Sequence, residues 1–154
     1  MLGRWSVRGS AAAIVAVLGL GTAGAAQAVP VQPHPAATWQ TNGRVNAIAV
    51  SGNTVYIGGQ FTSVRPPGSA AGSGEVARNH AAALNLKTGA LLPWNPNVNN
   101  TVRAIRVSGT TVYLGGAFTQ VGGANHSRVA AVNATSGAVL AGFKASASGE
   151  VFAL

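Results

Sequence analysis

Residues 45–64 read VNAIAVSGNTVYIGGQFTSV, and residues 102–121 read VRAIRVSGTTVYLGGAFTQV. The two stretches align without a gap at an offset of 102 − 45 = 57 residues. A third copy opens at residues 151–154, which read VFAL. Self-similarity at a fixed spacing indicates that one structural unit is repeated along the chain.

Each copy predicts four short strands, because apolar runs of four to seven residues alternate with Ser-Gly, Thr-Gly and Gly-Gly pairs and no helical period is sustained. In the first copy the strands are expected at residues 45–50, 54–58, 81–86 and 90–94. In the second copy they are expected at residues 102–107, 111–115, 129–134 and 138–143. The turn glycines occur where a positive φ is needed.

The predicted fold class is therefore all-β, and four-stranded antiparallel repeats of this period are typical of the blades of a β-propeller. We expect a partial propeller over residues 39–154. About two blades are present, at residues 45–94 and 102–143, and a third begins at residues 151–154. Two blades leave sheet edges uncovered, so we expect further blades in a longer chain, with residues 37–40 as the last strand of one of them.

Four sequence motifs carry a resemblance to a known family: Val-x-Ala-Ile-x-Val, Tyr-x-Gly-Gly-x-Phe-Thr-x-Val, Ala-x-Leu-Asn-x-x-Thr-Gly and Trp-x-Pro. They resemble the delta-60, kelch-like repeat propellers of secreted bacterial proteins, which are often joined to fibronectin-type or other surface modules. That family usually places Asp near the turn between strands three and four, whereas this chain has no Asp and carries Asn85 and Asn133 there. Asn still forms the local turn hydrogen bond, but the change puts carboxylate or calcium chemistry in doubt.

The N-terminus predicts export. Residues 1–28 combine two arginines, an apolar run at 11–24, and small residues at Ala26 and Ala28, which is the pattern of a secretory signal peptide cleaved after Ala28. The run is shorter than the roughly twenty residues that a membrane span needs, although an N-terminal anchor is the alternative. Residues 29–38 form a Pro-rich lead-in. We therefore expect a secreted, extracellular or cell-surface protein with no membrane span after cleavage.

Charge narrows the class of partner. The formal net charge of +8 falls to 8 − 2 = +6 without the two arginines of the leader, and the remaining cations are scattered singly. Nucleic-acid binding would want clustered Lys and Arg with interleaved aromatics, so no nucleic acid is expected. A cell-wall polymer, a polysaccharide or a surface protein remains a possible partner through long-range attraction.

The sequence predicts no catalytic, cofactor or metal site. Glu75 and Glu150 are the only acids, and nothing fixes them as the facing pair that a glycosidase needs. The three histidines have no Cys or Asp beside them to complete a metal site. No Gly-x-Ser-x-Gly elbow occurs, and no Asp can orient a catalytic base. The aromatic residues that recur in register are interpreted as packing residues.

A candidate binding face follows from strand direction. In an antiparallel blade the strand-two-to-three loops and the connections between blades leave on one side, and the short turns leave on the other. The second side carries chiefly Lys87. The candidate face on the first side comprises Arg65, Glu75, Arg78, His126, Arg128, Lys144 and Glu150. The loop that begins at Arg65 is longer than its counterpart in the second copy, and long loops on rigid scaffolds often bind, although a flexible excursion is the alternative.

Two functional hypotheses remain. The first is a non-catalytic binding or scaffold module that presents these loops to a protein or polysaccharide. The second is the N-terminal part of a secreted propeller enzyme, either polysaccharide-active or a quinone-type oxidoreductase, whose catalytic residues lie in blades outside this chain. Carboxylate pairs or cofactor ligands in those blades would favour the second hypothesis.

Overall fold

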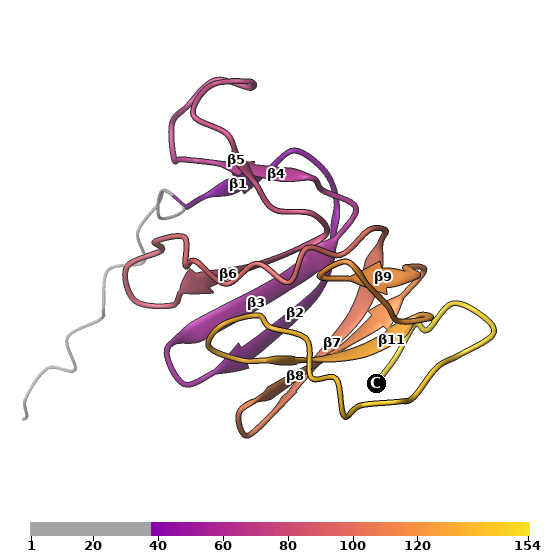
Figure 1. Ribbon diagram of the computed structural model, residues 1–154. Coiled ribbons are helices and arrows are strands. Elements are labelled where there is room, and N and C mark those ends of the chain that lie inside the picture. Colours follow the sequence, from indigo (N-terminus) through magenta and orange to yellow (C-terminus); the bar gives the residue numbers. More distant parts are fainter. Residues whose placement is uncertain (1–37) are drawn as a thin grey trace, which may run out of the picture. The chain divides into compact units, whose positions relative to one another are not determined.

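The computed structural model describes residues 38–154, which form antiparallel β-sheets without a helix (Figure 1). This confirms the predicted all-β class. No helix within residues 38–154 is long and apolar enough to cross a membrane. The predicted signal peptide, residues 1–28, and nearly all of the lead-in lie outside the described residues.

Two three-stranded sheets correspond to the two copies of the repeat. The first has the order β2 (Val45–Ser51), β3 (Thr54–Gly59) and β6 (Ala81–Asn85). The second has the order β7 (Val102–Ser108), β8 (Thr111–Gly116) and β11 (Val129–Asn133). Both carry a register shift at the same place in the first strand. The first three strands expected in each copy are therefore present.

The prediction of a fourth strand in each copy was wrong, because neither segment forms a strand. Residues 90–94 meet the first sheet at one isolated bridge, Leu84↔Leu91, and residues 138–143 meet the second at Val132↔Val139. In the first copy Pro93 follows and has no N–H to extend a ladder. In the second copy the Phe143 N–H donates back to the Leu140 carbonyl at 2.9 Å, and the chain turns.

Five very short strands complete the fold, and apart from Gln40 in β1 their residues were not predicted as strand. A small sheet has the order β1 (Gln40–Thr41), β4 (Ser63–Arg65) and β5 (Val76–Ala77), while β9 (Gln120–Val121) pairs with β10 (Ala124–Asn125). Residues 37–40 were expected to be the last strand of another blade. Of the described ones only Gln40 lies in a strand, which pairs with β4.

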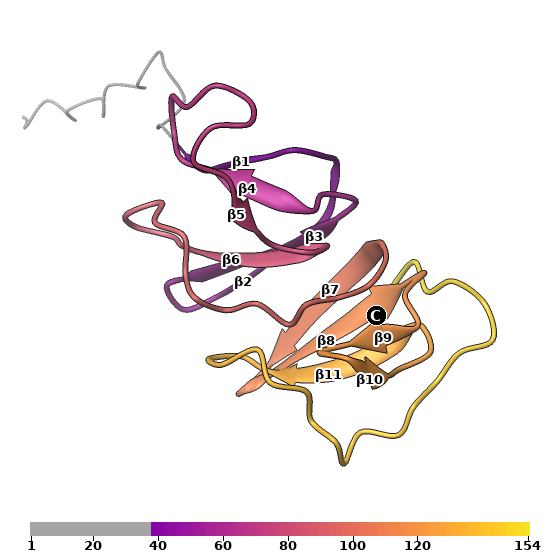
Figure 2. The same cartoon turned by 45° about the horizontal axis from the view of Figure 1, so that its top comes forward.

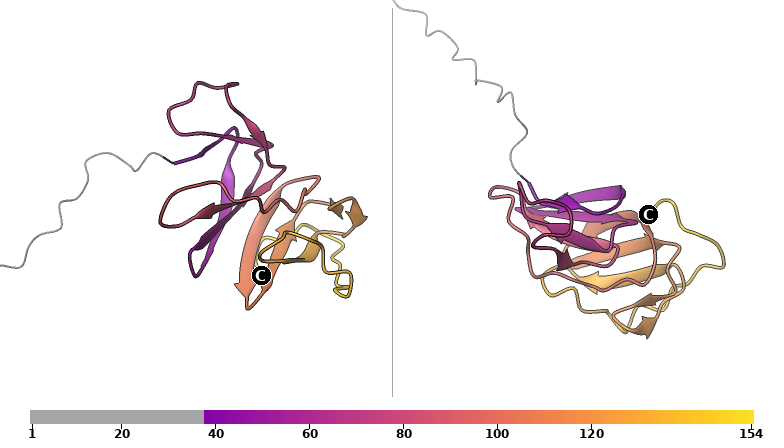
Figure 3. Two further views of the ribbon diagram at one scale, coloured as in Figure 1. Left: turned by 60° about the vertical axis from the view of Figure 1, so that its left-hand side comes forward. Right: turned by 90° about the horizontal axis from the view of Figure 1, so that it is seen from above.

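The two main sheets pack against each other, and Figure 2 shows them as separate layers. β2 and β7 lie side by side, as Figure 3 also shows. A shared core joins Tyr56 and Trp94 of the first copy to Val112, Leu114 and Val132 of the second. Burial of these side chains is the main force that holds the sheets together.

Gly58 sets how closely the sheets approach. A β-carbon at this position would lie 2.5 Å from Cγ1 of Val102 and 2.8 Å from Cδ1 of Ile105, closer than real contacts allow. Glycine is therefore required where the second sheet meets the first.

The turns after β6 and β11 confirm the expected role of asparagine. Oδ1 of Asn85 accepts hydrogen bonds from the backbone N–H groups of Lys87 and Thr88, at 3.0 and 2.9 Å. Oδ1 of Asn133 accepts the same pair from Thr135 and Ser136, both at 2.9 Å. An Asn side chain thus closes both turns.

Candidate functional site

The candidate face lies where the chain leaves the second strand of each main sheet. The β2–β3 and β7–β8 hairpins turn at one end of their sheets, and β4 and β9 follow the strands that run away from those turns (Figure 1). The seven predicted residues belong to the segments on this side. The structure divides them into separate groups.

Glu75 and Arg65 form the first group, at the two ends of the long loop of the first copy. Oε2 of Glu75 accepts a hydrogen bond of 2.6 Å from Oγ of Ser63, and Oε1 accepts one of 3.0 Å from the Gly72 N–H. Arg65 donates from Nη2 to Oε1 of Gln40 at 2.5 Å. The Ser63 hydroxyl, then the Gly72 N–H, and to a lesser degree the charge of Arg65 lower the pKa of Glu75. The carboxylate therefore fastens this loop to β4.

Arg78 and Arg128 are held by backbone carbonyls. Arg78 donates from Nη1 to the carbonyl of Ala77 at 2.9 Å and from Nη2 to that of Leu92 at 3.1 Å. Partial burial lowers the pKa of Arg78. Arg128 donates from Nη1 to the carbonyl of Ala147 at 3.1 Å. Arg78 thus connects the chain before β6 to the fourth run of the first copy, and Arg128 connects the chain before β11 to the segment that follows the fourth run of the second copy.

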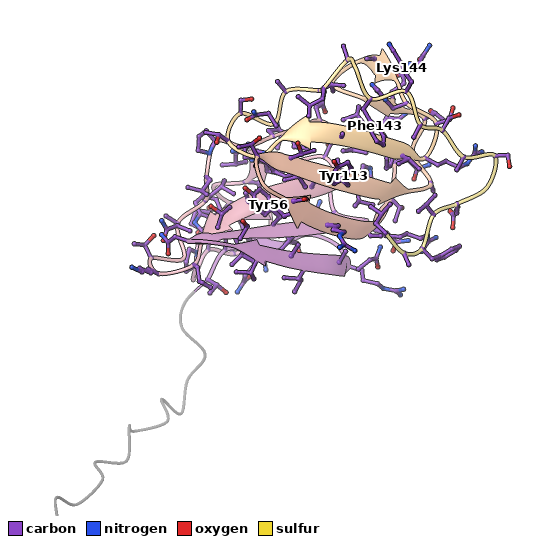
Figure 4. The ribbon with its side chains drawn as sticks, turned by 90° about the horizontal axis from the view of Figure 1, so that it is seen from below. Tyr56, Tyr113, Phe143 and Lys144 are labelled. Carbon is purple, nitrogen blue, oxygen red and sulfur yellow. The ribbon has the colours of Figure 1, made fainter. Side chains whose placement is uncertain are left out.

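His126 and Lys144 line a common cavity of about 400 Å³. Its other polar walls come from Asn125, Ser127 and Ser146, and Phe143 forms part of its apolar wall. Lys144 is exposed, and Figure 4 shows it beyond Phe143 and Tyr113. The cavity offers a cation and several neutral hydrogen-bonding groups, which suits an anionic or hydroxyl-rich ligand.

Glu150 is engaged with a residue that the sequence did not single out. Its Oε2 lies 2.8 Å from Nε of Arg103, and the guanidinium carbon of Arg103 lies 5.0 Å from the ring centre of Phe152. Among residues 38–154 this is the one ion pair. The two partners are 47 positions apart, so no local pattern could have revealed the pair.

The face is therefore not a single cluster. The two carboxylates bind different partners: Glu75 binds Ser63 on β4 and Gly72 in the long loop, and Glu150 binds Arg103 on β7. In the part of the chain that the structure describes, no group of three or more His, Asp or Glu side chains could hold a metal ion. What the arrangement offers is a set of separate polar surfaces with positive side chains.

A pair of asparagines shapes this side of the fold. Oδ1 of Asn42 accepts hydrogen bonds from the N–H groups of Thr62 and Ser63, at 2.8 and 3.1 Å, while Nδ2 donates to Oγ1 of Thr62 at 3.0 Å. Asn99 makes the same three bonds to residues 119 and 120, at 2.9, 3.0 and 2.9 Å. The two asparagines are 99 − 42 = 57 positions apart, which is the offset of the repeat, so the sequence could have revealed them as an equivalent pair.

No protein-family model, no curated protein and no solved structure matches this chain. The two copies of the repeat within the chain are similar to each other. The asparagine bonds, the closed turns and the bridges Leu84↔Leu91 and Val132↔Val139 recur in both copies. The two copies thus share detailed geometry as well as sequence.

Proposed function

We propose that the chain is a pair of β-propeller blades from a secreted or cell-surface protein, of the delta-60, kelch-like kind, with a binding or scaffold role toward a polysaccharide, a wall polymer or a surface protein. The observation that carries the propeller arrangement is a contact that occurs twice. Val102 and Ile105 pack over Gly58, and Val151 and Leu154 pack over Gly115.

In the second contact, as in the first, the two packing residues are three positions apart along the chain. A β-carbon at Gly115 would lie 2.7 Å from Cγ1 of Val151 and 3.3 Å from Cγ of Leu154. The Val151 N–H also donates to the carbonyl of Gly116 at 3.2 Å. A packing step that passes from each repeat to the next supports a radial arrangement of blades, and we expect further blades beside these two.

The binding role is supported by the positive side chains and the cavity on one side of the fold. Arg65 is the last residue of β4, where the long loop begins, and Lys144 and His126 line the cavity. Both glutamates already accept bonds from neighbouring side chains. Positive groups on loops of a rigid β-scaffold favour an anionic partner, such as an acidic wall polymer or polysaccharide.

The test is binding of the secreted protein to cells and to a purified anionic wall polymer. The double variant Arg65→Ala/Lys144→Ala should weaken binding several-fold, with a smaller salt dependence than the parent shows. Lys87→Ala is the matched control, because Lys87 is an exposed cation on the opposite side. Equal binding by the double variant and the control would rule out this face.

A further inference from the structure

The first sheet exposes apolar residues on one face, and the equivalent residues of the second sheet are packed against the core. Ile48 and Val50 on β2 are 65% and 56% exposed. At the same positions of the repeat, Ile105 and Val107 on β7 pack against the core between the sheets. We call the face that carries Ile48 and Val50 the leading face. The equivalent face of β7 makes the contact between the two sheets, whereas the leading face on β2 is exposed to solvent.

The second sheet presents the complementary surface. On the first sheet, the surface that receives Ile105 is built around Gly58 and Tyr56, with the Tyr56 and Trp94 rings in edge contact at 5.1 Å. We call its equivalent on the second sheet, built around Gly115 and Tyr113, the trailing face. There the rings of Tyr113 and Phe143 are in edge contact at 5.7 Å.

We infer that copies of this chain associate head to tail, with the leading face of one packed on the trailing face of the next. The inference rests on continuity with the contact between the two sheets and does not depend on the proposed ligand-binding role. Such a contact is heterologous, so it repeats from copy to copy and ends in a ring where the rotation between copies closes.

The register of the association is set by the repeat. On the incoming copy Val45 and Ile48 would take the positions over Gly115 that Val102 and Ile105 take over Gly58. Those positions hold Val151 and Leu154 in the structure, so this short segment must move aside. The segment is an internal competitor of the association.

One residue opposes the association. Arg106 on β7 stands at the repeat position of Ala49, faces the same side as Tyr113, and is exposed. An incoming face would have to pack around this charged side chain, and partial burial of its guanidinium costs free energy. An alanine at this position would restore the surface found on the first sheet.

The experiment is sedimentation velocity on the purified chain, with two face variants studied alone and mixed. Ile48→Glu places a charge on the leading face at a position that is already exposed, so folding should be unaffected. Gly115→Leu blocks the trailing face, where even a β-carbon would lie 2.7 Å from Cγ1 of Val151. Thr110→Glu, in an exposed hairpin turn, is the control.

The parent chain and Thr110→Glu should form complexes of discrete size. Each face variant alone should be monomeric, and an equimolar mixture of the two should give a one-to-one complex, because one intact face of each kind remains. Arg106→Ala should tighten association by about tenfold. A monomeric parent chain, or face variants that associate as the parent does, would overturn the inference. A mixture that stays monomeric while both variants retain the circular dichroism of the parent would also overturn it.

Discussion

The hydroxyl of Tyr56 donates a hydrogen bond of 2.8 Å to the backbone carbonyl of Ala134, and so joins a strand of the first sheet to the turn of the second. The Nε1 group of Trp94 donates to the neighbouring carbonyl of Asn133 at 3.0 Å. The aromatic pair thus fixes the turn of one repeat against the face of the previous one. Tyr113 has the same place on the second sheet, where residues 38–154 provide no hydrogen-bond partner for its hydroxyl.

Tyr56→Phe should lower the free energy of unfolding by about 1 kcal/mol, because it leaves the ring in place and removes one partly buried hydrogen bond. Tyr113→Phe is the matched control and should cost less. Burial raises the pKa of Tyr56 above its usual 10.0, although the Thr54 side chain acts in the opposite direction. The contribution of this hydroxyl should therefore persist below pH 10 and be lost as the pH rises further. Equal losses in urea melts of the two variants would contradict this role.

Asn42→Ala and Asn99→Ala should each lower the free energy of unfolding by about 1–2 kcal/mol. Each change removes three hydrogen bonds at once, two of them from backbone N–H groups that would then depend on solvent. Asn125→Ala is the control, since Asn125 is exposed and accepts one bond of 3.2 Å from a side chain. Chemical denaturation measures all three. A control as costly as the other two would show that the effect is not specific to these bonds.

The Gly72 amide should report the ionisation of Glu75. Because the pKa of Glu75 is held below its usual 4.5, the hydrogen bonds of its carboxylate should be intact above pH 4.5 and be lost as the pH falls through the lowered value. An NMR titration of the Gly72 amide measures the midpoint. Ser63→Ala removes the largest cause of the shift and should raise the midpoint toward 4.5. A midpoint at or above 4.5 in the parent chain would contradict the assignment.

Gly58→Ala should destabilise the chain by about 1–3 kcal/mol, because the added carbon would press on Val102 and Ile105 between the sheets. Gly142→Ala is the control: a β-carbon there meets nothing within 4 Å, and no positive φ is required. It should be neutral or slightly stabilising. Thermal and urea unfolding compare the two. A neutral Gly58→Ala would mean that the sheets do not approach so closely.

The sequence predicted the strands where local chemistry dominates. The alternating apolar runs, the turn glycines and Asn85 act within a few residues of one another, so their pattern is visible in one dimension. β4 and β9 were missed because strands of two or three residues are too short to show a period. The fourth strands were overestimated because Pro93 interrupts the ladder in one copy and a turn does so in the other.

The candidate site was less predictable because side-chain partners are set by tertiary structure. Strand direction placed Arg65, Arg78 and Arg128 on one side of the fold, but could not show that Arg78 and Arg128 bind backbone carbonyls. The pairing of Glu150 with Arg103 joins residues far apart in sequence. The cavity beside Lys144 depends on the path of the chain after Phe143, which no motif specifies.

Disulfide cross-linking tests most directly the claim that each repeat packs its first strand over the glycine of the previous one. The chain has no cysteine, so pairs can be introduced without background. Gly58→Cys/Val102→Cys and Gly115→Cys/Val151→Cys should both cross-link within one chain under mild oxidation. The exchanged pair Gly58→Cys/Val151→Cys should not, because Val151 lies over Gly115. Efficient cross-linking of the exchanged pair, or failure of both matched pairs, would contradict the account.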